Sequence, residues 1–190
     1  MSLPQLILAS VSPRRAELLK ELDVPFEIVP SDAEEEHTEQ LTAVELCQLN
    51  AYRKARVVAK RLPDKLVIGV DTLVTLGPAL YGKPRDLLDA ARMLRELQGK
   101  THLVVSGVCL LHLRRHRQRL FVDGTLVTFR PLSEEAIQAY HARIQPLDKA
   151  GGYAIQDNGD ELVESITGSF NNVVGLPLER LKEELKAFEE

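Results

Sequence analysis

The sequence contains few residues that could form a zinc site or a disulfide framework. It has two cysteines, Cys47 and Cys109, among 190 residues. Their spacing and number support neither kind of site. We expect the five histidines to be scattered surface or packing residues. These shortages exclude a small zinc-binding module and a disulfide-stabilised secreted scaffold.

Long apolar runs are also missing. No stretch approaches the length of a membrane span. The apolar residues 3–9 are too few and lack a basic leader, so they predict a strand and not a signal peptide. We therefore expect a protein of the cytoplasm with no membrane partner.

Positive charge is in short supply overall, since the formal net charge is −4. The surface as a whole should not attract nucleic acid, so a polyanionic ligand would need a local basic cluster. The one dense basic run, residues 114–119, lies between two predicted strands without interleaved aromatic residues. We expect a solvated hairpin tip there, with nucleic-acid binding as the alternative.

Strand and helix patterns alternate along the chain, with no linker and no repeat. The expected strands cover residues 5–9, 26–29, 66–70 with a continuation to 76, 101–113, 118–129 and 162–166. The expected helices cover residues 13–22, 42–62, 87–97, 133–142 and 177–188. Residues 31–40, 77–84 and 147–158 are expected as loops. This pattern predicts an α/β fold with a mixed sheet in a single domain over residues 1–190.

The segment Ser-Val-Ser-Pro-Arg-Arg at residues 10–15 follows the first predicted strand and opens a helix. Ser12 suits the N-cap position, and a proline suits the first helical position. The unpaired amides of a helix start favour phosphate, and Ser10, Arg14 and Arg15 could add donors. A capped surface helix with solvated arginines is the alternative interpretation.

Acidic residues occur at two places that suit a hard cation. Asp71 follows a buried strand directly, where ligands of open α/β sheets gather. A carboxylate there can bind a metal or accept a proton from water. Residues 32–36 form an acidic loop that could supply a second ligand. The alternatives are a turn-capping aspartate and a solvated charge run.

Further polar residues stand beside turns and helices. Lys54 lies on the capped helix, Lys83 lies in Gly-Lys-Pro, and Lys149 precedes Ala-Gly-Gly. Each alone is expected as a surface lysine, whereas together with the two arginines they could neutralise a triphosphate. The amide of Gln156 could contact a base edge, although a buried structural glutamine is an equal alternative.

Taken in order, these segments resemble the Maf family of nucleotide pyrophosphatases over essentially the whole chain. The residues that carry the resemblance are 8–15, Glu34 and Glu35, Lys54 and Ala55, 69–72, 82–84, 148–151, Ile155 and Gln156, and 174–178. Each motif is weak alone, and their order and spacing together are specific.

The resemblance implies two α/β lobes around a cleft, similar to the inosine triphosphate pyrophosphatases, with a mixed, twisted sheet and flanking helices. It implies hydrolysis of a nucleoside triphosphate to the monophosphate and pyrophosphate with Mg²⁺ or Mn²⁺. By resemblance, Asp71 is the general base and Glu35 its metal partner. Ser10, Arg14, Lys54 and Lys83 match phosphate positions, and Arg14, Thr72 and Gln156 match positions of substrate choice. A homodimer would be similar to relatives.

Residues 148–156 look like the branch of the family that acts on dTTP and UTP. Pro13 directly before Arg14 fits that branch, because the branch acting on 7-methyl-GTP usually carries an aromatic residue before its paired arginines. Ala154 and Asp157 depart from the family pattern, in which glycine is usual. Action on 7-methyl-GTP or another modified nucleotide, and a nucleotide-binding regulator of cell division without turnover, are the alternatives.

Overall fold

The computed structural model describes residues 5–38 and 40–189, so residues 3 and 4 of the apolar stretch 3–9 lie outside the described part. The strands are β1 (Leu6–Leu8), β2 (Phe26–Ile28), β3 (Leu66–Leu76), β4 (Ala79–Tyr81), β5 (Thr101–His112), β6 (Arg117–Phe129) and β7 (Val163–Thr167). The helices are α1 (Pro13–Lys20), α2 (Ala43–Arg61), α3 (Leu87–Leu97), α4 (Glu134–His141), α5 (Gly159–Leu162), α6 (Phe170–Val174) and α7 (Leu178–Glu189). Two 3₁₀ turns cover Pro146–Asp148 and Ala150–Gly152.

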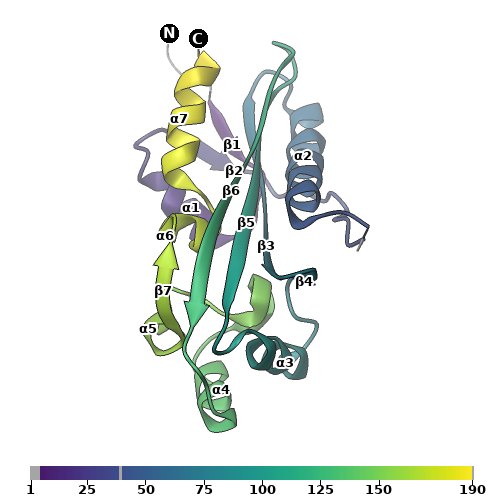
Figure 1. The fold of residues 1–190 in the computed structure, drawn as a ribbon. Helices are drawn as coiled ribbons and strands as arrows, with labels where there is room; N and C mark the ends of the chain where they lie inside the picture. Colours follow the sequence, from purple (N-terminus) through teal and green to yellow (C-terminus); the bar gives the residue numbers. More distant parts are fainter. Residues whose placement is uncertain (1–4, 39, 190) are drawn as a thin grey trace. The chain divides into compact units, whose positions relative to one another are not determined.

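The strands form one mixed sheet in the order β2-β1-β3-β5-β6-β7, with β4 added to β3 (Figure 1). β1 pairs in parallel with β2 and with β3. The pairs β3–β4 and β6–β7 are antiparallel. The predicted α/β class, with a mixed, twisted sheet and flanking helices, is confirmed.

Local signals explain where several helices begin. The Thr42 hydroxyl accepts a hydrogen bond from the Glu45 amide, and the Glu45 carboxylate accepts one from the Thr42 amide, so the predicted capping box is present. At α1, Ser12 holds the N-cap position, but its side chain makes no capping bond. The Ser12 amide instead donates to Ser10 Oγ over 3.2 Å. The predicted N-cap position of Ser12 is thus confirmed, without a capping bond from its side chain.

Three short elements were not expected. Residues 77–84 were predicted as a loop, yet Ala79–Tyr81 pairs with the end of β3. The helical turns α5 and α6 also lie outside the expected helices. Such elements have too few residues to show a period, and tertiary pairing decides their conformation.

By its contacts the chain divides into two compact units. Unit 1 contains the chain up to Asp71, Ser106–Asp123 and the residues from Gly175 onward. Unit 2 contains Thr72–Val105 and Gly124–Val174. The long strands β3, β5 and β6 each contribute residues to both units.

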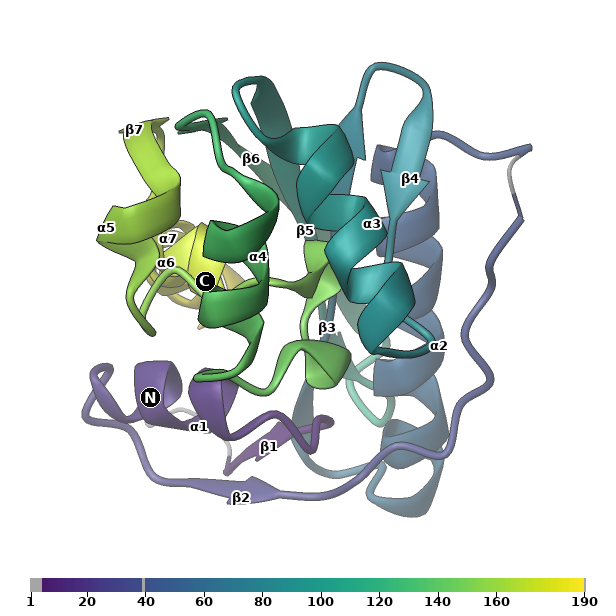
Figure 2. The same cartoon turned by 90° about the horizontal axis from the view of Figure 1, so that it is seen from below.

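In unit 1, helix α2 lies on one side of the sheet, while α1 and α7 lie on the other (Figures 1 and 2). Glycines in two strands allow α2 to approach closely. A Cβ atom added at Gly69 would lie 2.2 Å from the Ala51 carbonyl oxygen. One added at Gly107 would lie 2.5 Å from the Cys47 carbonyl oxygen. Only glycine fits at these contacts, which fix the height of α2 over β3 and β5.

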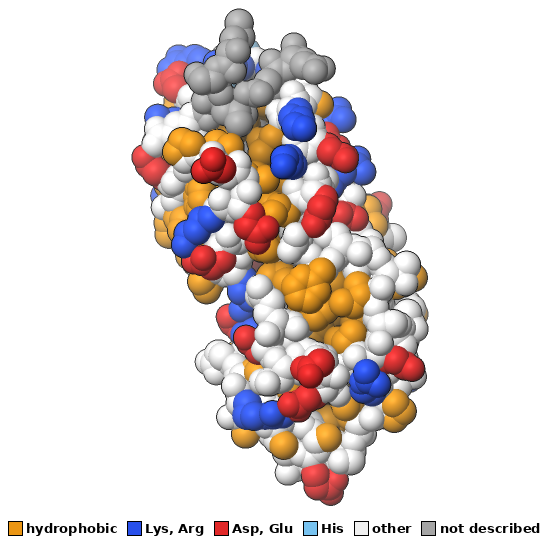
Figure 3. Space-filling model, turned by 90° about the vertical axis from the view of Figure 1, so that its left-hand side faces the viewer, with side chains coloured by type: hydrophobic (Ala, Val, Ile, Leu, Met, Phe, Trp, Pro, Cys, Tyr) orange, Lys and Arg blue, Asp and Glu red, His pale blue; other side chains and the backbone are white. Residues whose placement is uncertain are grey.

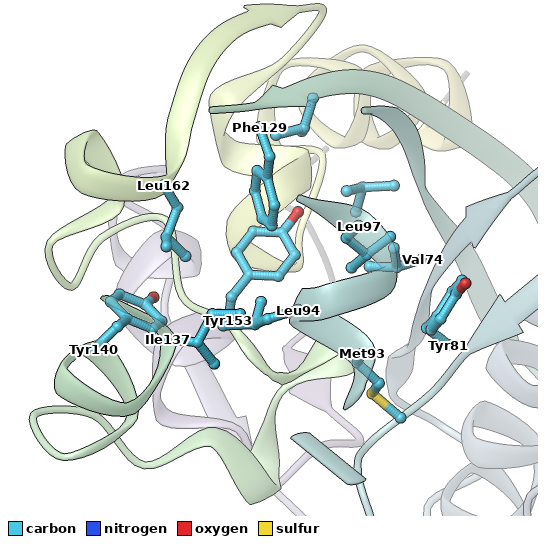
Figure 4. Packing of buried hydrophobic residues seen from close by; sticks show 12 residues of the cluster. Val74, Tyr81, Met93, Leu94, Leu97, Phe129, Ile137, Tyr140, Tyr153 and Leu162 are labelled. Atoms are coloured by element: carbon cyan, nitrogen blue, oxygen red, sulfur yellow. The ribbon is translucent and has the colours of Figure 1, made fainter. Parts of the chain in front are cut away.

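Unit 2 has its own apolar core, in which Tyr153 packs beside Phe129 and near Leu94 (Figure 4). The ring centroids of Phe129 and Tyr153 lie 4.8 Å apart in an edge-to-face arrangement. His102 joins this group, since its Nε2 lies 2.8 Å from Tyr153 Oη and its ring meets Phe129 edge-on. Burial lowers the pKa of His102 to about 4. The imidazole is therefore neutral at physiological pH.

Within the described residues, no helix has both the length and the apolar character needed to cross a bilayer.

The close contact at Gly69 predicts the effect of a single methyl group. Gly69→Ala forces α2 away from β3, because the new Cβ meets helix backbone that cannot rotate aside. We expect a loss of about 1–3 kcal/mol and a melting temperature lower by roughly 5 °C. Gly124→Ala is the matched strand control, because its Cβ would lie 3.4 Å from one Leu103 methyl carbon. Equal melting temperatures for the two variants would contradict this account of the packing.

The buried His102 predicts a loss of stability in mild acid. Its folded pKa of about 4 lies below the ordinary 6.5, so between these values the unfolded chain binds a proton that the folded chain does not. The free energy of unfolding should therefore fall as pH drops from about 6.5 to 4, by roughly 3 kcal/mol. Urea titrations of the wild type and His102→Gln across this range measure it. If the free energy of unfolding of His102→Gln falls with pH as steeply as that of the wild type, another group causes the pH dependence.

Candidate functional site

Three charged side chains of unit 1 meet at the ammonium group of Lys54. Lys54 Nζ lies 2.7 Å from Asp71 Oδ1 and 2.8 Å from Glu35 Oε1. It also donates to the Val70 carbonyl oxygen over 3.4 Å. The lysine comes from α2, the aspartate from β3 and the glutamate from the acidic loop. The structure thus brings together three of the predicted catalytic residues, which we call the Lys54 cluster.

Two members of the Lys54 cluster are largely shielded from solvent, since the side chains of Lys54 and Asp71 are 12% and 8% exposed, while that of Glu35 is 32% exposed. Charges in such surroundings attract more strongly than in water, and breaking one pair leaves a costly unpaired charge. Arg15 is near the cluster as well: burial lowers its pKa, while the charges of Asp71 and Glu35 raise it. Two cations therefore face two carboxylates.

Arg15 uses its guanidinium to fasten backbone segments of unit 1 together. Its Nε donates to the Gly175 carbonyl oxygen over 2.8 Å, and its Nη1 donates to the Val70 carbonyl oxygen over 3.1 Å. Nη1 also lies 3.4 Å from Ser10 Oγ. These bonds hold the start of α1 against the β3 segment that carries Asp71. Arg15 was also predicted to bind substrate. That role stays a prediction, in addition to the structural role of these backbone contacts.

Ser10 and Arg14 stand at the same helix start. Ser10 is buried, and its hydroxyl oxygen accepts from the Ser12 amide, which orders the turn before α1. Arg14 is half-buried in the first helical turn. An anion at this position would meet backbone amides and the positive end of the helix dipole.

The remaining predicted residues belong to unit 2. Thr72 is half-buried and follows Asp71 directly on β3, while Lys83 and Gln156 are exposed. The Gly151 amide donates to the Gly82 carbonyl oxygen over 3.0 Å, which joins the loop of Lys83 to the loop after Lys149.

Lys149 differs from the expected free surface cation. It is 7% exposed, and its Nζ donates to the Gln145 carbonyl oxygen over 2.6 Å and to Asp148 Oδ1 over 2.7 Å. A lysine held in this way stabilises its own loop. Its predicted contact with substrate remains a prediction.

One polar residue at the site was missed in the sequence. Asn50 on α2 is buried and donates to Asp71 Oδ2 over 3.3 Å. The available signal was its position four residues before Lys54, which places both side chains on one face of the helix.

The carboxylates of Asp71 and Glu35 fit a hard divalent cation in their chemistry. Both are oxygen donors, and both already contact a single positive group, the Lys54 ammonium. No group of three or more histidine, cysteine or acidic side chains suited to a metal occurs among the described residues. A cation held here would thus take two protein carboxylates and draw its other ligands from phosphate or water.

The basic turn between β5 and β6 is largely engaged with neighbours in unit 1. Arg114 pairs with Asp64 over 2.8 Å, Arg119 pairs with Glu184, and Arg117 lies over the Phe188 ring. One face of the molecule shows positive and negative side chains interspersed (Figure 3). These contacts favour the solvated hairpin tip over a nucleic-acid surface.

Comparison with known proteins finds relatives over nearly the whole chain. The model of the family described as Maf-like protein matches residues 5–188. A dTTP/UTP pyrophosphatase of Acetivibrio thermocellus is 45% identical, with 97% of this chain and 95% of the relative covered. Another of Gloeobacter violaceus is 46% identical over 97% of this chain and 96% of the relative.

Solved structures share the fold at low identity. The Ham1 protein of Staphylococcus aureus matches with a TM-score of 0.56 and 16% identity, covering 98% of this chain and 100% of the other. A HAM1 protein of Coxiella burnetii matches with a TM-score of 0.54 and 14% identity, over 97% and 100% of the two chains. The family match over residues 5–188, with relatives 45–46% identical over nearly the whole chain, shows that the chain belongs to the Maf family.

Proposed function

We propose that this protein hydrolyses dTTP and UTP to the nucleoside monophosphate and pyrophosphate. The observation that carries the proposal is the Lys54 cluster, in which a largely shielded lysine holds Asp71 and Glu35 together. The nearly full-length relatives named dTTP/UTP pyrophosphatase support the choice of substrate. A site that only bound a triphosphate would gain from cations, whereas paired carboxylates suit hydrolysis.

Asp71 is the proposed general base. One of its oxygens is held by Lys54 and the other by Asn50, so its carboxylate has a fixed direction. Each oxygen keeps a further lone pair that can orient a water and accept its proton during attack on the α-phosphorus. No residue pair is needed as a covalent nucleophile, because pyrophosphate is a good leaving group.

Positive groups would stabilise the charge that develops on the phosphates. Lys54 and Arg14 of unit 1 fill this role in the proposal, and the amides at the start of α1 add fixed donors. The phosphate role of Lys83 stays a prediction from the family resemblance. Asp71 and Glu35 would hold Mg²⁺ or Mn²⁺, which when bound neutralises phosphate charge and lowers the pKa of water. Before any ligand binds, the Lys54 ammonium group holds the two carboxylates close to each other.

Base recognition is assigned to Gln156. Its exposed amide both donates and accepts, which matches the single Watson–Crick face of uracil or thymine. Asp157 beside it is exposed as well. An acidic neighbour would favour a base that presents a donor or a positive charge. 7-Methyl-GTP is therefore the second candidate substrate.

Replacement of the base tests the proposal directly. Asp71→Asn keeps the size of the side chain but cannot accept the proton, so turnover should fall by about 10²–10⁴-fold while the chain stays folded. Pyrophosphate release from a nucleotide panel measures it for both proteins. We expect dTTP and UTP to be the best substrates of the wild type. Near-normal turnover by the variant would contradict the role of Asp71. Nucleotide binding without turnover by the wild type would favour a regulator.

Metal removal tests the contribution of the cation to turnover separately from that of the protein side chains. Dialysis against EDTA should abolish turnover, and Mg²⁺ or Mn²⁺ should restore it. Glu35→Gln should raise the Mn²⁺ concentration needed for half-maximal rate by about 10-fold or more, because one charged ligand is lost. Glu34→Gln is the control, since Glu34 is its exposed neighbour in the loop. Full activity in EDTA would contradict the metal requirement.

A further inference from the structure

Asn50 on α2 forms hydrogen bonds through both ends of its side-chain amide. It is 2% exposed. Its Oδ1 accepts from the Glu36 amide over 2.7 Å, and its Nδ2 donates to the Glu36 carbonyl oxygen over 3.0 Å. Nδ2 also donates to Asp71 Oδ2 over 3.3 Å. One buried amide thus binds both backbone groups of a loop residue and one carboxylate.

The backbone of Glu36 fixes which way the Asn50 amide points. An amide N–H can only face an acceptor, and a carbonyl oxygen can only face a donor, so the reversed amide would lose both bonds to Glu36. The group that faces Asp71 is therefore always the donor. An oxygen there would repel the carboxylate.

The contact with Glu36 also bears on Glu35, the next residue in the chain. Asn50 anchors the loop at Glu36, and Lys54, one helical turn later, contacts Glu35 Oε1 over 2.8 Å. Asn50 and Lys54, on the same face of α2, therefore each contact the acidic loop. Each of them also donates a hydrogen bond to the Asp71 carboxylate. Both proposed metal-binding carboxylates depend on this face for their separation and direction.

We propose that Asn50 is a positioning residue that sets the direction of the Asp71 carboxylate and the place of the Glu35 loop for hydrolysis. The proposal rests on the proposed function of Asp71. Asn50 itself does not touch the reacting atoms. Loss of Asn50 should lower kcat and the affinity for the cation. KM should change little, because other residues make the substrate contacts.

The first test separates kcat from KM. Asn50→Leu keeps the branched shape without any polar group, and Asn50→Asp keeps an acceptor but loses both donors. We expect kcat for dTTP to fall about 10–100-fold in each, with KM within roughly threefold of the wild type. Assays well below the melting temperature exclude unfolding. Gln48→Glu, a half-buried change on the same helix, is the control and should keep its kcat. A normal kcat in both Asn50 variants overturns the proposal.

The second test is a double-mutant cycle read by Mn²⁺ affinity, measured by electron paramagnetic resonance without nucleotide. Wild type, Asn50→Leu, Asp71→Asn and the double variant are compared. If Asn50 acts through Asp71, the Asn50→Leu change weakens Mn²⁺ binding clearly when Asp71 is present. The same change has a much smaller effect in the Asp71→Asn background. Equal losses in the two backgrounds mean a general structural role and overturn the proposal.

The two tests also distinguish this proposal from the proposed function. A wild-type protein that turns over no nucleotide refutes the function, yet the Mn²⁺ cycle still decides whether Asn50 acts through Asp71. A wild-type protein that is active, with additive losses in the cycle and normal kcat in the variants, refutes the role of Asn50 alone.

Discussion

The close approach of helix α2 to strand β3 is the constraint on which the site of unit 1 depends. Gly69 leaves no side chain between the strand and the backbone of Ala51, so the helix lies directly on the sheet. Asn50 and Lys54 flank that contact on α2, and Asp71 lies two residues after Gly69 on β3. This close packing at Gly69 brings the Asn50 amide and the Lys54 ammonium group within hydrogen-bond distance of the Asp71 carboxylate.

Electrostatics then decides what the arrangement can do. A carboxylate as shielded as Asp71 needs partners, and Lys54 and Asn50 supply them. The same partners hold the acidic loop, so that Glu35 reaches the same ammonium group. Two carboxylates in one place, beside a helix start that favours phosphate, match the needs of metal-assisted triphosphate hydrolysis. The similar proteins of the Maf family are named dTTP/UTP pyrophosphatases.

Much of the fold could be predicted from local patterns. The capping box of Thr42 and Glu45 and the apolar run before Asp71 are signals within a few residues of the element that they define. The meeting of Glu35, Lys54 and Asp71 came from family resemblance, because separate motifs carry no distances. Asn50 was missed because a single asparagine in a helical pattern gives no sign of what it faces.

The roles of Arg15 and Lys149 show the limit of charge patterns. Arg15 looked like a phosphate ligand, yet its bonds reach the backbone of Gly175, 160 residues away in the chain. Lys149 looked exposed, yet its ammonium group is buried against Gln145 and Asp148. A sequence shows the charge of such side chains, whereas only the tertiary structure shows which acceptors they have found.

The most direct test of the account is a crystal structure with Mn²⁺ and a non-hydrolysable dUTP analogue, with the metal located by anomalous diffraction. The account predicts an anomalous peak bound by the carboxylates of both Asp71 and Glu35 and by phosphate oxygens, with Lys54 beside the phosphates. A metal and triphosphate bound away from Asp71 and Glu35 would contradict it.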